Sequence, residues 1–257
     1  MSIFTSYSEK THPFKATFNL VLMSLLITAL FWLALSLVGV RLNFSFLAPL
    51  SGRIFDGYLM TVCLSAASFF ISLLLGVACA AMQSGKILVL RYFAKLYVIA
   101  IRGTPLIMQV YLFFYLMGTA YGITNRFICG VLILSLFEGA YIAEIVRGSL
   151  LSMDGTQLEA AKAVGFTKKQ QLALVVLPQL LARTLPALTG QFASMIKDSS
   201  LLCMIALIEL TQTLREISAM NFKMFECYML LGVLYLSLTL PITYASKRLE
   251  QRFDYEA

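Results

Sequence analysis

Long apolar runs separated by short polar connections make up most of this chain of 257 residues. Four intervals between charged residues contain no charge of their own: Lys15 to Arg41, Asp56 to Lys86, Arg102 to Arg126, and Glu226 to Lys247. Each interval holds about the 20 apolar residues that a helix needs to cross a hydrocarbon core of roughly 30 Å. Because backbone in lipid must satisfy its own hydrogen bonds, each interval predicts a membrane-spanning helix.

Two further apolar runs are interrupted by charge. One, at about 127–146, contains Glu138, and the other, at about 185–207, contains Lys197 and Asp198. With these runs the pattern predicts an all-α, polytopic membrane protein of about six transmembrane helices. The helices are expected at about 17–39, 57–82, 90–117, 127–146, 185–207 and 226–246.

The third helix has a composite start. Arg91, Lys95 and Arg102 fall within a narrow arc of a helix, which is typical of a helix at the membrane interface or of a snorkelling helix base. The sequence Gly103-Thr104-Pro105 then predicts a bend or a new helix start before the helix continues to about 117.

Composition and charge support a membrane protein and give it an orientation. The chain is 60% hydrophobic and only 13% charged, whereas soluble domains carry roughly a quarter charged residues. With the N-terminus inside, fourteen of the twenty basic residues fall on predicted cytoplasmic segments. The placement of the basic residues that make up the net charge of +7 therefore indicates a multi-pass membrane protein with both termini cytoplasmic, and no nucleic-acid partner.

Few residues could support catalysis or metal binding. The five cysteines lie in or at apolar runs without paired spacing, which favours packing over disulfides or a metal site. The one histidine, His12, lies in the polar N-terminal tail, and the first apolar run is too long for a signal-peptide core. Gly85-Lys86 lacks the other residues of a phosphate-binding loop. We therefore expect a protein that is not an enzyme and that binds no metal or cofactor itself.

The longest polar connection, at about 147–184, is predicted to begin with a short cytoplasmic helix. Thr156 and Glu159 have the spacing of a capping box, and Gly165 supplies a left-handed residue that ends the helix. A helix of barely two turns is marginal in water, so it needs a surface on its own bundle or in the groove of a soluble partner. The apolar side chains for such a groove are Leu158, Ala161 and Val164.

A second short helix is predicted in the same connection. Thr167 and Gln170 repeat the capping-box spacing and open this helix, which runs to about Val176. Pro178 is expected to close it, because proline does not continue a helix.

The connection also carries a recognisable motif. Glu-Ala-Ala, three residues, Gly, nine residues, an aliphatic residue, any residue and Leu-Pro resembles the signature loop of the membrane subunits of binding-protein-dependent ABC importers. The matching positions are Glu159, Ala160, Ala161, Gly165, Val175 (usually isoleucine), Leu177 and Pro178. Motifs similar to the polar amino acid uptake branch flank it: Arg102-Gly103-Thr104-Pro105-Leu106, Gly139 to Gly148, and Lys197-Asp198-Ser199-Ser200-Leu201.

The resemblance, which covers about 57–250, implies a five-helix importer core preceded by one additional helix. It divides the chain into 1–56 (cytoplasmic tail, additional helix and external loop), 57–250 (transmembrane domain) and 251–257 (cytoplasmic tail). It implies that the short helix docks on a cytoplasmic ABC ATPase, which binds ATP and Mg in place of this chain. The contact residues would be Glu159, Ala160, Ala161 and Gly165, with Leu158 and Val164 beside them.

The resemblance also implies a function and partners. The chain would be the permease subunit of an ATP-driven importer of a polar amino acid in the bacterial inner membrane. Its partners would be an ABC ATPase dimer, a second permease subunit, identical or related, an extracytoplasmic amino-acid-binding protein and the lipid bilayer. Two alternatives stay open: an importer of another small solute, and an ion-coupled secondary carrier, for which we find no convincing inverted repeat.

Charged residues inside predicted spans are candidates for the solute pathway, because they cost roughly 2.5–3.5 kcal/mol on insertion scales. Glu138 would favour a cationic group if it faces the pathway, and otherwise forms a hydrogen bond between helices. Lys197 and Asp198 point to different faces, and a general gating or structural role suits them better than solute selection. Neutral polar contacts would come from Gln109, Tyr111, Tyr115 and Gln191.

Overall fold

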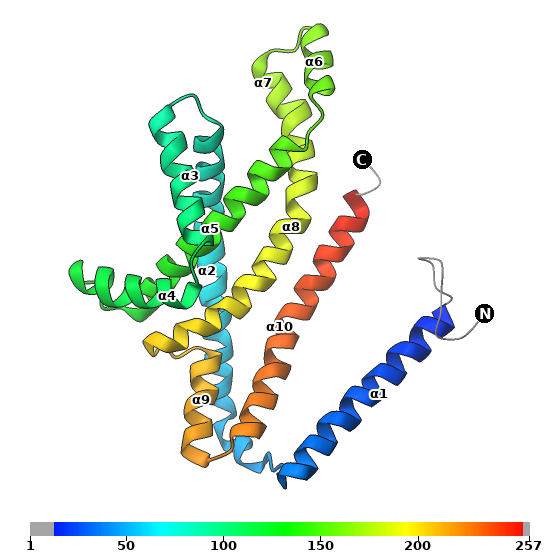
Figure 1. The fold of residues 1–257 in the computed structure, drawn as a ribbon, viewed down its shortest axis with the longest axis vertical. Coiled ribbons are helices and arrows are strands. Elements are labelled where there is room, and N and C mark those ends of the chain that lie inside the picture. Colours follow the sequence, from blue (N-terminus) through cyan, green and yellow to red (C-terminus); the bar gives the residue numbers. More distant parts are fainter. Residues whose placement is uncertain (1–12, 254–257) are drawn as a thin grey trace. The chain divides into compact units, whose positions relative to one another are not determined.

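The computed structural model describes residues 13–253, and every regular element in them is helical (Figure 1). In chain order the elements are α1 (Pro13–Val38), η1 (Ser45–Leu50), α2 (Ser51–Ser84), α3 (Leu88–Arg102), α4 (Leu106–Tyr111), η2 (Leu112–Gly118), α5 (Arg126–Leu151), α6 (Gly155–Ala163), α7 (Lys168–Gln171), η3 (Leu172–Val176), α8 (Leu177–Asp198), η4 (Ser199–Ile205), α9 (Leu210–Asn221) and α10 (Met224–Phe253). Two of the short elements, η2 and η3, are π-helical, and η1 and η4 are 3-10 helices. His12 and the rest of 1–12 and 254–257 lie outside the described residues.

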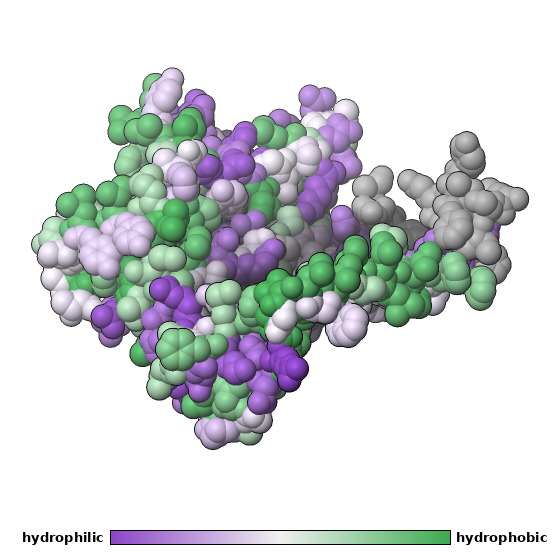
Figure 2. Space-filling model, turned by 60° about the horizontal axis from the view of Figure 1, so that its bottom comes forward, coloured by the Kyte–Doolittle hydropathy of each residue, from purple (hydrophilic) through white to green (hydrophobic). Residues whose placement is uncertain are grey.

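Residues 1–45 form one unit of the chain, and α1 is its helix. The helix is long and apolar enough over Thr17–Val38 to cross a membrane, and its visible surface is mostly hydrophobic (Figure 2). Leu20 and Trp32 are each 71% exposed and Leu37 is 80% exposed. A helix that is apolar on all sides is typical of a lipid environment. The predicted first helix is confirmed, with its start at Pro13 instead of about residue 17.

The second unit, residues 46–257, is built around the pair α2 and α5. Small residues buried on α2 recur at spacings of three and four: Ser65, Ser68, Ser72 and Gly76. Such residues let helix backbones approach closely, and the Ser135 hydroxyl on α5 donates a 3.2 Å hydrogen bond to the Ser68 carbonyl. The approach is closest at Gly76, where an added methyl group would lie 2.5 Å from Cγ2 of Ile142.

A sharp break separates α3 from α4, with an angle of 108° between the helices. Gly103 and Pro105 lie at this break, where the hydrogen-bond ladder of α3 ends. The buried side-chain amide of Gln109 donates 2.8 Å hydrogen bonds to the Ile101 carbonyl and the Thr104 hydroxyl. The Gln109 side chain thus supplies a hydrogen-bond donor to a backbone carbonyl that has no helical partner at the break, as an apolar environment requires. The predicted bend is confirmed.

The number of spans depends on this break. Within residues 13–253, five helices are long and apolar enough to cross a membrane, and the bent α3–α4 pair with η2 is counted as a sixth only if it forms one span. The predicted span between Arg102 and Arg126 is therefore not a straight crossing helix. The chain turns by 108° at its start, and the helical part ends at Gly118.

The helix predicted at about 185–207 begins much earlier in the structure. A helical stretch runs from Lys168 to Ile205 through α7, η3, α8 and η4. Pro178 does not close a helix, and that prediction was wrong. It lies in the first turn of α8, where its missing N–H and fixed φ are tolerated.

Three helices complete the second unit, and one of them was not predicted. α8 packs against α10, and the Ser246 hydroxyl on α10 donates a 2.8 Å hydrogen bond to the Pro186 carbonyl on α8. The connection between the helices predicted at about 185–207 and 226–246 contains α9. Its buried Leu210, Leu214 and Ile217 form a core cluster with Ile54 and Cys227. The α9 helix thus joins α2 to α10.

Gly76→Ala is expected to destabilise the protein by about 1–3 kcal/mol, because the added methyl group would force α2 away from Ile142. Gly232→Ala is the matched control, since a methyl group there would meet no heavy atom within 4 Å. Thermal unfolding of both variants and the parent protein in detergent micelles measures the difference. Equal melting temperatures for the two variants would contradict the close α2–α5 contact.

Candidate functional site

The short helix predicted in the polar connection is α6, but Asp154 and not Thr156 caps it. The Asp154 carboxylate accepts a 2.9 Å hydrogen bond from the Thr156 amide, which lowers the pKa of this carboxyl below its ordinary value of 3.8. The predicted box of Thr156 with Glu159 is wrong because the helix begins earlier, at Gly155. The second predicted box, between Thr167 and Gln170, is confirmed and opens α7.

Gly165 ends α6 as predicted. Its φ is +86°, in the left-handed region that favours glycine. The amides of Gly165 and Phe166 donate 3.0 Å hydrogen bonds to the carbonyls of Lys162 and Ala161, which is the Schellman pattern. No heavy atom within 4 Å would meet a Cβ at this position, so glycine is required by the backbone conformation and not by lack of space.

One side of α6 faces its own chain. Ala161 is buried and Leu158 is half-buried. These two side chains therefore seat the helix within the subunit. Leu158 and Ala161 therefore offer less surface to a partner's groove than Val164, which is exposed. A contact of these residues with a partner stays a prediction.

The other side of α6 is exposed. Glu159, Ala160, Ala163 and Val164 have the spacing of one helix face, and Val164 is 77% exposed. We call these four residues the presented face. Ala163 was not predicted, because its role depends on which side of the helix lies against the chain.

The connection is tied to α8 by hydrogen bonds between side chains. The Gln179 amide donates to the Gln157 side-chain oxygen at 2.5 Å. Arg183 donates to the Ser152 hydroxyl at 2.7 Å, just before α6. These contacts connect α6 and the residue Ser152 before it to the first turns of α8.

Two of the flanking sequence motifs meet in space. The Arg102 guanidinium at the end of α3 lies 3.2 Å from the Glu144 carboxylate on α5. Arg147 donates two 2.8 Å hydrogen bonds to the same carboxylate. Arg102 also lies over the Tyr141 ring, 5.2 Å from its centroid. This ionic cluster fixes the end of α3 to α5 next to the α3–α4 break.

A second polar group lies inside the bundle, between α5 and α8. Glu138 is fully buried; one carboxylate oxygen accepts a 2.5 Å hydrogen bond from the Gln191 amide, and the other has no hydrogen-bond partner. The carboxyl group of Asp198 interacts with that of Glu138. Two carboxylates placed close together repel each other unless a cation compensates them. The structure thus brings together three of the predicted pathway residues.

The remaining predicted pathway residues lie elsewhere. The Gln109 nitrogen serves the α3–α4 break, and its buried oxygen has no hydrogen-bond partner. Tyr111 stacks on Tyr115 with ring centroids 5.8 Å apart, and both rings are partly exposed. Lys197 is exposed whereas Asp198 is half-buried, in keeping with their different faces. A pathway role for these side chains stays a prediction.

The cysteines and acidic residues do not form a metal centre in the described part of the chain. Between residues 13 and 253 no three His, Cys, Asp or Glu side chains are grouped as metal ligands would be. All five cysteines are free; four are buried in the helix bundle, and Cys63 is exposed. The buried four serve as small packing residues, as the sequence predicts.

Asp154→Ala is expected to weaken α6, because the first amides of the helix lose the carboxylate that accepts from them. Hydrogen exchange of residues 155–163, followed by mass spectrometry, should become several-fold faster. Thr156→Ala is the control and should have the smaller effect, since Thr156 is not the N-cap. A larger effect of Thr156→Ala would support the capping box of Thr156 with Glu159 that was first predicted.

The same cap predicts a pH dependence. Because the pKa of Asp154 is lowered, the contribution of its carboxylate to the stability of α6 is present above pH 3.8 and is lost as pH falls through that lowered pKa.

Comparison with known proteins identifies relatives over most of the chain. Residues 72–255 match the family described as binding-protein-dependent transport system inner membrane component. The L-cystine transport system permease protein TcyB of Bacillus subtilis is 35% identical over 212 residues, which cover 82% of this chain and 88% of that protein. The glutamine transport system permease protein GlnP of Escherichia coli K12 is 31% identical over 215 residues, which cover 83% and 98%.

Solved structures agree with this relationship. The crystal structure of an amino acid ABC transporter with histidines superposes with a TM-score of 0.77 at 29% identity, covering 83% of this chain and all of that one. An inward-facing MetNI methionine ABC transporter has a TM-score of 0.67 at 20% identity over 80% of this chain, and supports the fold. Given the extent of the family match and the identity to both permeases, the chain belongs to the family of binding-protein-dependent transport system inner membrane components.

Proposed function

We propose that this chain is the permease subunit of an ATP-driven importer that moves a polar amino acid across the bacterial inner membrane. The observation that carries the proposal is that this member of the family exposes the presented face of α6, where a partner protein could bind. Relatives named as L-cystine and glutamine permeases, and a related structure named as an amino acid ABC transporter, support the cargo class. The chain is not an enzyme, and ATP with Mg is bound by a separate ATPase.

Four partners follow from this function. They are a cytoplasmic ABC ATPase dimer, a second permease subunit, an extracytoplasmic amino-acid-binding protein and the bilayer. The excess of basic residues on the segments assigned to the cytoplasm supports an orientation with α6 and both termini inside. Family membership weighs against the ion-coupled secondary carrier. An importer of another small solute would share this mechanism and differ only in cargo.

The hydrogen bonds of the connection suggest how ATPase motion reaches the solute pathway. Closure of the ATPase would displace α6, and the Gln157–Gln179 and Ser152–Arg183 contacts would carry α8 with it. From Gln179 to Gln191, α8 spans about 18 Å at 1.5 Å per residue. Because a packed helix moves as a rigid element, the contact of Gln191 with Glu138 should change between the two states of the transporter.

Glu159→Ala combined with Val164→Asp is expected to lower ATP-driven uptake at least about tenfold, since loss of a central interface contact costs about 2 kcal/mol or more. Both side chains are exposed, so the subunit itself should fold normally. Uptake is measured in proteoliposomes that contain the permease, its ATPase and the binding protein. The amount of ATPase that co-purifies with the permease should fall as well.

Glu250→Ala is the matched control for this double variant. Glu250 is an exposed glutamate near the end of α10, outside the presented face. Its replacement should leave uptake and ATPase co-purification at the parent level. Parent-level uptake in the Glu159 and Val164 double variant would contradict the coupling role. If Glu250→Ala lost as much uptake as the double variant, the loss would be a general effect of removing a negative charge and would not show coupling.

The buried group at Glu138 supports a cargo that carries a cationic group. Glu138 has one oxygen without a partner, and Asp198 adds a second carboxyl beside it. A solute ammonium group placed here would compensate both carboxylates, whereas an anion would add repulsion. An α-amino group meets this requirement in every amino acid.

Glu138→Gln is expected to lower uptake at least about tenfold, because a hydrogen bond to a charged group contributes about 1.5–3 kcal/mol. L-Arginine, which brings a second cation, should lose more than L-glutamine when uptake is normalised to folded protein. The matched control is Glu209→Gln: Glu209 is also buried, but its oxygens accept from the first amides of α9, so it should keep the parent ratio of the two rates. Rates for Glu138→Gln within twofold of the parent would remove Glu138 from the pathway.

A further inference from the structure

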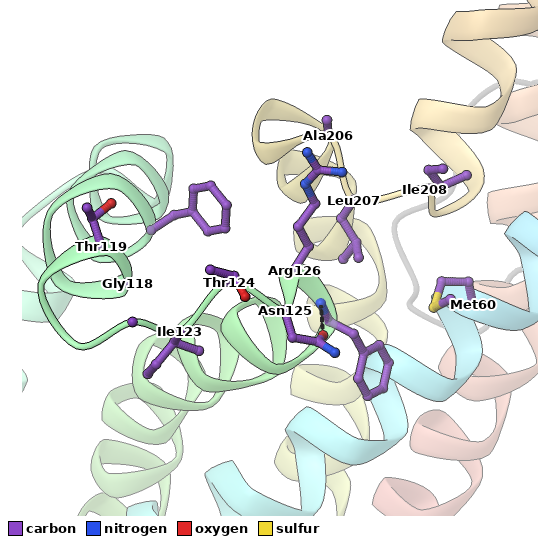
Figure 3. A pocket seen from close by; sticks show the side chains of 13 residues that line it. Met60, Gly118, Thr119, Ile123, Thr124, Asn125, Arg126, Ala206, Leu207 and Ile208 are labelled. Carbon is purple, nitrogen blue, oxygen red and sulfur yellow. Dashed lines mark hydrogen bonds between the residues drawn. The ribbon is translucent and has the colours of Figure 1, made fainter.

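A cavity of about 620 Å³ opens at the N-terminal end of α5 (Figure 3). Its walls come from α2, from η2 with the turn that follows, from the start of α5, and from the connection between η4 and α9. Apolar side chains make up much of the lining: Met60, Phe114, Ile123, Phe127, Leu207 and Ile208. Its volume lies within the roughly 300–1,000 Å³ of small-molecule sites.

The cavity and the α6 connection lie at opposite ends of α5. This helix begins with Arg126 at the cavity and ends at Leu151, shortly before α6 begins. At 1.5 Å per residue, a helix of this length extends about 39 Å, with Glu138 near its middle. If α6 faces the ATPase, the cavity opens on the side where a binding protein releases its solute.

Arg126 is the charged side chain of the cavity lining, and Figure 3 shows it extending toward the segment 206–208. The Arg126 side chain is exposed, and it makes no ion pair and no hydrogen bond with any residue that the structure describes. Glu209, the acid that follows this segment, is buried, and its carboxylate accepts hydrogen bonds from the first amides of α9 and from Tyr235. Arg126 is therefore an unpaired cation at the mouth of a largely apolar cavity.

Further hydrogen-bond donors lie beside Arg126. Oδ1 of Asn125 accepts from the amides of Phe127 and Ile128 at 2.9 and 3.1 Å, so the start of α5 is already capped. The side-chain nitrogen of Asn125 is left as a donor, two threonine hydroxyls also line the cavity, and none of the lining residues is acidic. A guanidinium with neighbouring neutral donors is suited to a carboxylate.

We propose that this cavity is an outer binding site for the α-carboxylate of the transported amino acid, which Arg126 and Asn125 hold. The proposal rests on the proposed function and adds a second station to it. Phe114 on η2 offers an apolar wall for the rest of the solute, and π-helical turns such as η2 are frequent at functional sites. Glu138 lies about 18 Å further along α5 and has the opposite charge preference.

Protection of an introduced thiol tests the site. Cys63→Ser removes the exposed cysteine, and Thr124→Cys places a thiol in the cavity wall. The complete importer, with ATPase and binding protein in lipid nanodiscs, is labelled with a maleimide, and labelling at residue 124 is followed by mass spectrometry. We expect L-glutamine or L-histidine, whichever the importer takes up, to slow labelling, and the corresponding α-carboxamide not to slow it.

Arg126→Gln in this background should raise the amino acid concentration for half-protection at least about tenfold, as expected for loss of a hydrogen bond between charged groups. Arg126→Lys keeps the charge and should recover part of the protection. Arg41→Gln, at an exposed arginine outside the lining, removes the same charge and should leave the concentration unchanged.

The outcomes separate this proposal from the function on which it rests. If an amino acid that the same importer takes up does not slow maleimide labelling at residue 124, the outer site is overturned and the proposed function still stands. Failure to take up any of the amino acids would instead count against the proposed function. If Arg126→Gln kept full protection but lowered stimulation of the ATPase by the binding protein, Arg126 would serve to dock that protein, and the carboxylate site would be overturned.

Discussion

Backbone groups in an apolar environment must find partners inside the protein, and this constraint decides where the chain departs from straight helices. At the α3–α4 break, the Gln109 side chain donates to the carbonyl of Ile101, which the interrupted ladder leaves free. At η2 the backbone changes to π-helical bonding and keeps its donors occupied. At the start of α5, the Asn125 side chain accepts hydrogen bonds from two backbone amides that have no partner within the helix. The last two of these places, η2 and the start of α5, form part of the wall of the outer cavity.

Features that depend on local composition could be predicted from the sequence, and features that depend on packing could not. The spans follow from apolar length, and the end of α6 follows from Gly165, whose conformation needs no distant contact. Asp154 was missed because an aspartate and a threonine two residues apart are both good caps, and the direction in which the chain enters α6 chooses between them. Pro178 looks the same in sequence whether it ends one helix or lies in the first turn of the next. Ala161 and Ala163 are chemically identical, so only packing reveals that one is buried and the other presented.

The candidate site shows the same division. Glu138 is conspicuous in the sequence as an acid within an apolar run, yet its partner Gln191 lies 53 residues away on α8. The fold makes this contact because α5 and α8 pack together. The same reasoning applies to Arg102 and Glu144, which belong to separate motifs and meet only because α3 ends against α5. The sequence indicates which polar and charged side chains are unfavourable in a membrane, and the packing of the helices decides which of them contact one another.

The arrangement of charge along α5 places a limit on how one solute could use it. Arg126 stands at one end, Glu138 near the middle and the Glu144–Arg147 pair beyond it. One carbon atom joins the two charged groups of an α-amino acid, so a single molecule cannot reach both Arg126 and Glu138 across about 18 Å. In the proposed pathway the two residues therefore act in succession: Arg126 binds the carboxylate of the solute, and Glu138 binds its amino group. Transport requires each binding step to be weak enough to reverse. Separating the two charge contacts meets this requirement, because neither station holds both ends of the solute.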